Sequence, residues 1–116
     1  MTDAPKALSE RDAVRFYHPV HDKKRTRVVI HIQSETAIVI FGRGRQLDGL
    51  GAYEAVQFPS SEASALDLYK TTYFHTRCVV RVRLLAVERV GRCPPGLFAR
   101  LRPIALQGVR TMVTLR

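Results

Sequence analysis

Two glycines alternate with two arginines directly after an apolar run in the middle of the chain. The run extends from Ile38 to Phe41, and the letters GRGR at residues 42–45 follow it. The apolar run predicts a buried strand, and glycine lets the backbone turn tightly or approach another group closely. Backbone amides and guanidinium groups both suit oxyanions. Arg43 and Arg45 therefore predict a phosphate-holding turn, and the alternative is a pair of solvated turn residues.

Positive charge is concentrated in the last third of the chain. The formal net charge is +9, and residues 77–116 contribute +8 of it through nine arginines against Glu88, without a single lysine. Arginine binds phosphate bidentately and stacks on bases, which lysine does not do. This asymmetry favours an anionic polymer such as DNA or RNA as the partner. A bias toward arginine also follows from GC-rich coding, so charge alone does not decide the partner.

A long strand over residues 78–90 is predicted to carry part of this charge. Alternation places Cys78 and Val80 on an apolar face and Arg81, Arg83 and Arg89 on the other. The arginine face is either a solvated face or a track for nucleic acid. It also contains exposed apolar residues between the arginines, namely Val79, Leu85 and Val87.

An antiparallel sheet with one main helix is the predicted scaffold, which makes the fold α+β. The helix begins after Pro59 with Ser60 as its N-cap. Its apolar stripe of Ala63, Leu66, Tyr69 and Tyr73 extends to a predicted end near residues 75–77. We expect a sheet of about four to five strands. Six ranges are candidates for these strands, namely residues 15–20, 27–33, 36–41, 52–58, 78–90 and, as a last short element, 108–115. Residues 1–11 are expected to form a flexible lead, and residues 12–116 a single domain.

Catalytic and metal-binding patterns are missing from the sequence. His18 and His21 have a spacing that suits zinc, but no cysteine or carboxylate pair accompanies them. The spacing of Cys78 and Cys93 fits neither a metal motif nor a disulfide framework, so we expect two free thiols. The carboxylates are scattered, no nucleophile motif is present, and the glycine-arginine turn lacks the lysine and hydroxyl residue of a P-loop. We expect neither an enzyme nor a cofactor.

The distribution of apolar residues indicates a cytoplasmic protein. No apolar run approaches the roughly 18 residues that span a membrane. Met1 to Glu10 is polar and contains no signal-peptide core. The sequence therefore predicts no membrane partner.

The sequence Phe41-Gly42-Arg43-Gly44 is followed by Gly49, Gly51 and the strand from Tyr53 to Phe58, and this pattern, over residues 26–77, resembles the WGR domain of poly(ADP-ribose) polymerases and small bacterial proteins. In that family a strand ends in Trp-Gly-Arg. This strand is followed by a glycine-rich loop, a second strand and a helix that begins with a serine-containing turn. Phe41 stands at the tryptophan position here, and Ala52 at a position that is commonly glutamine. The resemblance implies contact with nucleic acid, with Arg43 near a phosphate and Phe41 against a sugar. The residues that carry it are Phe41, Gly42, Arg43, Gly44, Gly49, Gly51, the strand from Tyr53 to Phe58, Ser60, Glu62, Ala63 and Ala65.

Together these features predict a small, non-enzymatic nucleic-acid-binding domain. It would contact the backbone electrostatically through the glycine-arginine turn and the arginine-rich strand and tail. The alternative is a protein-interaction module, an accessory or inhibitor subunit whose arginines dock an acidic protein surface or which forms a homodimer. The choice between DNA and RNA, and between single and double strand, stays open. The predicted contact residues are Phe41, Arg43, Arg45, Arg81, Arg83 and Arg89.

Overall fold

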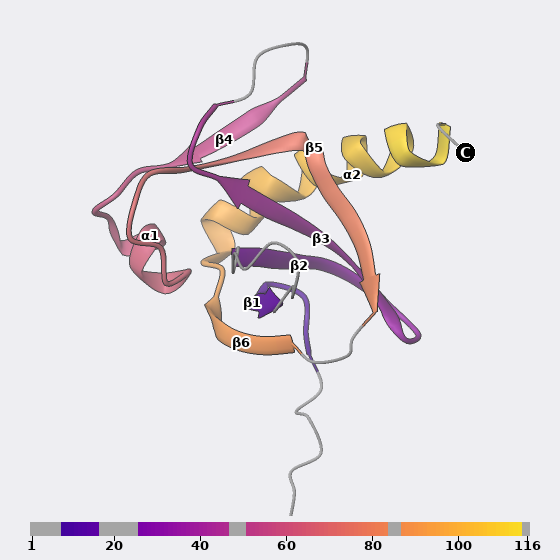
Figure 1. Cartoon of the computed structure of the whole chain (residues 1–116), viewed down its shortest axis with the longest axis horizontal. Helices are drawn as coiled ribbons and strands as arrows, with labels where there is room; N and C mark the ends of the chain where they lie inside the picture. Colours follow the sequence, from indigo (N-terminus) through magenta and orange to yellow (C-terminus); the bar gives the residue numbers. More distant parts are fainter. Residues whose placement is uncertain (1–7, 17–25, 47–50, 84–86, 115–116) are drawn as a thin grey trace, which may run out of the picture.

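Six antiparallel strands and a long C-terminal helix dominate the computed structural model, which describes residues 8–16, 26–46, 51–83 and 87–114 (Figure 1). The sheet has the order β4-β5-β3-β2-β1-β6. This confirms the α+β class, with more strands than predicted. The elements are β1 (Asp12–Phe16), β2 (Thr26–Gln33), β3 (Thr36–Arg43), β4 (Tyr53–Val56), α1 (Ser61–Ala65), β5 (Thr72–Arg83), β6 (Val87–Arg92) and α2 (Pro95–Thr114).

Apolar side chains are buried on both faces of the sheet. On the face that packs against α2, which we call the helix face, the strand residues Val28, Ile40 and Phe74 join Leu97 and Leu101 of the helix in one buried cluster. On the opposite face, a second buried cluster consists of Val14, Val29, Ala37 and Val39. The middle strands therefore read as nearly continuous apolar runs, as expected where both faces are covered.

The main helix is not where the sequence predicted it. A strand over residues 108–115 was expected, but residues 95–114 form one helix. Its buried stripe of Leu97, Leu101, Ile104 and Ala105 follows the spacing i, i+4, i+7 and i+8, which is helical. Pro95 suits the first helical position. Burial of this stripe against β5 outweighs the poor helix residues inside α2 (Figure 1).

The helix that was expected to extend from Ser60 to about residue 76 is only one turn and a half long. Ser60 is its N-cap, as predicted: its hydroxyl accepts from Ala63 N at 3.1 Å. The helix ends at Ala65, and Asp67 adopts a left-handed backbone with φ of 57°. The β-branched and aromatic residues from Thr72 onward enter β5 instead. The predicted burial of Tyr69 is consequently wrong, because this residue is 75% exposed.

The first and the longest predicted strands also differ from those observed. β1 occupies residues 12–16 rather than 15–20, and residues 17–20 lie outside the described part. The single strand expected over 78–90 is divided between β5 and β6. Its continuation through residues 84–86 lies outside the described residues. β6 crosses the sheet to pair with β1.

Both cysteines are buried, and no disulfide joins them. Burial is the main cause that raises the pKa of Cys93 from 9.0 to about 12. Because the thiolate is the reactive form, the thiolate fraction of Cys93 at pH 8 falls roughly a thousandfold.

We therefore expect iodoacetamide at pH 8 to leave Cys93 unmodified in the native protein and to alkylate it readily in denaturant. Peptide mass spectrometry measures this. Rapid native alkylation of Cys93 would contradict its packed position beneath α2.

Candidate nucleic-acid interface

The last residue of β3 lies in a row of side chains that crosses three strands. Arg43 pairs with Tyr73 of β5, and Tyr73 pairs with Ala55 of β4. Gly42 and Phe74, the next pair, belong to the helix face, since Phe74 is in the core beneath α2. Side chains alternate between the faces of a sheet. Arg43 and Tyr73 therefore lie on the face opposite the helix, where Tyr53 joins them two residues before Ala55.

The two tyrosines form a ring pair at this end of the sheet. The ring centroids of Tyr53 and Tyr73 are 6.3 Å apart, and the ring planes are tilted by 53°. Aromatic pairs at this separation and tilt attract each other beyond their burial. Tyr73 is half-buried, whereas Tyr53 is 44% exposed. The pair holds one exposed aromatic ring beside the end of β3.

Three cations surround the glycine-arginine turn. Arg43 is half-buried, and Arg45 and Lys70 are exposed. The Lys70 Nζ lies 2.8 Å from where a Cβ on Gly44 would stand, so the ammonium group rests against the backbone of the turn. The side chain of none of the three makes a hydrogen bond or an ion pair with a described residue. We call Arg43, Arg45, Tyr53, Lys70 and Tyr73 the strand-end surface.

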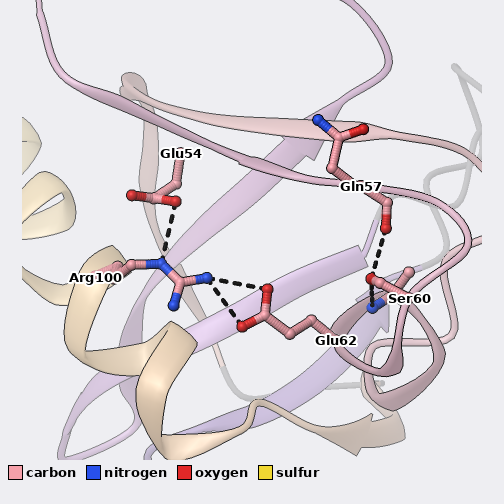
Figure 2. A network of polar contacts seen from close by, with 6 residues as sticks. Glu54, Gln57, Ser60, Glu62 and Arg100 are labelled. Atoms are coloured by element: carbon pink, nitrogen blue, oxygen red, sulfur yellow. Dashed lines mark hydrogen bonds and ion pairs between the residues drawn. The ribbon is translucent and has the colours of Figure 1, made fainter.

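Three carboxylates in the neighbouring described segments pair with other arginines. Arg100 of α2 donates from Nε to Glu54 Oε2 at 3.2 Å and from Nη2 to both carboxylate oxygens of Glu62, at 2.9 and 3.0 Å (Figure 2). The hydrogen bonds to Glu62 raise the pKa of Arg100. Asp67 pairs with Arg15 at 3.1 Å.

This network fixes the edge strand from its helix side. Glu54 faces α2, so its neighbour Tyr53 must point to the opposite face. Figure 2 shows Glu54 and Glu62 converging on Arg100 from two different segments, while the Ser60 hydroxyl donates to Gln57 O at 2.6 Å. The contacts tie α2 to β4 and α1, and thereby hold Tyr53 in place.

Gly42 allows close packing where β3 meets β5. A Cβ at this position would overlap Thr72 Cγ2 and would lie 3.1 Å from Phe74 Cζ. The first glycine of the GRGR motif is therefore explained by packing, and the second by the approach of Lys70. Both keep Arg43 and Arg45 at the surface while the strands stay close.

His75 lies directly across from Tyr53 and is buried. Its Nδ1 accepts a hydrogen bond from Arg77 N at 3.0 Å, which places the ring proton of the neutral form on Nε2. Burial and, second, the charge of Arg77 lower the pKa of His75 below 6.5. His75 is thus a neutral ring at pH 7 that supports Tyr53 without adding charge.

The structure does not bring the predicted arginines together into one surface. Arg83 pairs with Thr36 and Arg81 with Ile38, at the opposite end of the β3–β5 ladder from Arg43. Seven residues of β3 separate Thr36 from Arg43, which corresponds to about 23 Å. Arg81 and Arg83 are exposed there, away from the strand-end surface.

Phe41 and Arg89 occupy different positions again. Phe41 is half-buried and pairs with Arg27 on the face opposite the helix, two residues before Arg43. Arg89 Nη1 lies 3.9 Å from Asp12 Oδ1, as does Arg92 Nε, and Asp12 is only 1% exposed. A buried carboxylate requires compensating charge. Arg89 therefore has a role in the fold that the sequence did not indicate.

Three members of the strand-end surface were missed as candidate binding residues. Tyr53 had a usable signal, because strand alternation placed it on the face away from Val56. Tyr73 was assigned to a buried helical stripe, and its position beside Arg43 depends on the pairing of β3 with β5. Lys70 is 27 residues from Arg43 in the sequence, and no local pattern connects them.

Metal and membrane sites are not evident in the described parts of the chain. No group of three histidine, cysteine or acidic residues there could hold a metal ion. His18 and His21, which were predicted to lack the further ligands of a zinc site, lie outside the described ranges. No helix in the same ranges is long and apolar enough to cross a membrane.

Comparisons with known proteins give no relative from which a function could be transferred. No known family model matches the chain, and no curated protein matches it significantly. The resemblance to the WGR domain therefore stays a prediction from the residues.

Proposed function

We propose that this domain binds the sugar-phosphate backbone of nucleic acid at the strand-end surface and catalyses no reaction. The observation that supports the proposal most is the combination at the end of β3. Arg43, Arg45 and Lys70 have no carboxylate partner in the described structure, and Arg43 lies across from an aromatic residue. Cations left without internal partners are available for phosphate, and aromatic neighbours suit nucleotides.

The mechanism is electrostatic positioning. The planar guanidinium groups of Arg43 and Arg45 bind phosphate oxygens bidentately, and Lys70 adds a compact charge beside the turn. The overall charge of +9 attracts a polyanion from a distance. Contacts of this kind fix the register of the nucleic acid and carry no sequence information.

The rival proposal of a protein partner loses one of its sequence arguments. It relied on Val79, Leu85 and Val87 as exposed apolar residues between arginines. Val79 is 5% exposed and packs in the core with α2. Leu85 and the side chain of Val87 lie outside what the structure describes. We therefore place nucleic acid first and an acidic protein second.

Binding to labelled oligonucleotides at several salt concentrations tests the proposal. Three phosphate contacts predict that log K falls with log salt with a slope of about −2 to −3. Fluorescence anisotropy with both DNA and RNA measures the slope. No binding to either polymer at low salt, or binding that is independent of salt, would refute the proposed function.

A further inference from the structure

The strand-end surface holds an exposed aromatic ring beside its cations, and phosphate binding alone does not require that ring. Building on the proposed function, we propose that the ligand is single-stranded nucleic acid. One unpaired base stacks on Tyr53 while Arg43, Arg45 and Lys70 hold neighbouring phosphates.

Tyr53 is supported from below and open on the outside. Tyr73 packs against it at 6.3 Å between ring centroids, and His75 faces it from β5. β4 is the first strand in the sheet order, so no strand of the described structure covers its outer edge. The residue remains 44% exposed although it has two aromatic neighbours. A flat ligand can therefore reach a ring that is already fixed in orientation.

The ring and the cations are at a distance that a short piece of one strand can bridge. Arg43 on β3 and Tyr53 on β4 are separated by β5 alone. Adjacent strands are about 4.8 Å apart, which puts the two backbones about 10 Å from each other. The base and the phosphates of consecutive nucleotides can contact both positions.

The interior of a duplex could use the cations but not the ring. Away from its ends, a double helix covers both faces of each base by stacking, and exposing one requires unstacking energy. A single strand presents its bases directly, and every base has a face that stacks, so this contact tolerates any sequence. An exposed tyrosine next to cations that have no side-chain partner among the described residues therefore favours single strands over duplexes.

The test compares ligands that carry the same phosphates but differ in their bases. An oligothymidylate of about 12 nucleotides, an abasic strand of equal length and a duplex are titrated into the full chain at one low salt concentration. We expect oligothymidylate to bind about tenfold more tightly than the abasic strand, as one stacked base predicts. Equal affinities for the two strands would refute stacking and leave the proposed function intact. Binding to neither would refute both.

Variants then locate the stacking residue. Tyr53→Ala should abolish the preference for oligothymidylate over the abasic strand, and Tyr53→Phe should retain the preference. Tyr69→Ala is the matched control, because Tyr69 is 75% exposed and lies outside the surface. Circular dichroism verifies the fold of each variant. A preference that survives in folded Tyr53→Ala would overturn the assignment to Tyr53.

Discussion

Replacing Arg43 and Arg45 together by alanine is expected to weaken nucleic-acid binding at low salt by tenfold or more. Each lost charge-assisted hydrogen bond contributes about 1.5–3 kcal/mol where it is made, and about 1.4 kcal/mol equals a factor of ten. Neither arginine has an internal partner in the described structure, so their removal should leave the stability of the fold nearly unchanged. Anisotropy titrations measure the affinity, and thermal unfolding monitors stability.

Arg81 and Arg83 provide a control with the same loss of charge. Arg81 lies about 17 Å and Arg83 about 23 Å away along β3, and both are exposed. Their double alanine variant lowers the net charge equally, so the two variants share any long-range effect of charge. We expect the distant variant to lose much less affinity. Equal losses would show that the whole basic molecule, rather than the strand-end surface, binds the polyanion.

Gly108→Ala is expected to destabilise the fold by about 1 kcal/mol, net of the better helix propensity of alanine. A Cβ at this position would overlap the carbonyl oxygen of Thr76 and lie against Val79. These atoms belong to β5, so α2 would have to move away from the strand on which it packs most extensively. Overpacking of this kind costs about 1–3 kcal/mol, and it exceeds the helical gain of about 1 kcal/mol. Chemical denaturation measures the difference.

Gly96 in the same helix is the control for Gly108. A Cβ there meets nothing within 4 Å. Gly96→Ala should therefore leave stability unchanged or raise it by up to about 1 kcal/mol. Two identical substitutions in α2 are thus predicted to have opposite signs. If Gly108→Ala were also neutral or stabilising, the close contact between α2 and β5 would be wrong.

Local patterns in the sequence located the middle strands and one helix start. Alternation found β2, an apolar run found β3, and a serine after a proline found the N-cap of α1. Alternation failed within β2 at one point. The spacing of Val28, Ile30 and Ile32 predicts one shared face for the three side chains, but a register irregularity between Val29 and His31 turns Ile32 to the opposite face. A one-residue bulge of this kind has no signature in the letters.

The helices show why the rest could not be predicted. Residues after Leu66 have apolar spacing that suits a helix, yet pairing with β3 and β4 makes them a strand. A last short strand was predicted from Gly108 onward, yet burial against β5 keeps α2 continuous. In both places tertiary contacts outweigh local propensity.

The candidate site was predictable only where it is local. Arg43 and Arg45 follow a strand and two glycines, which the sequence displays directly. Tyr73 and Lys70 reach them through the pairing of β3 with β5 and the packing at Gly44. The predicted continuity with Arg81 and Arg83 failed for the same reason, since the direction of β5 decides which end each residue occupies.

Amide chemical shifts during an oligonucleotide titration test the central claim most directly. We predict that addition of a short single strand to the nitrogen-15-labelled protein shifts the resonances of residues 42–45, Tyr53, Lys70 and Tyr73 together. Those of Arg81 and Arg83 should change little. Saturating shifts confined to Arg81, Arg83 or α2, with the strand-end surface unaffected, would contradict the account.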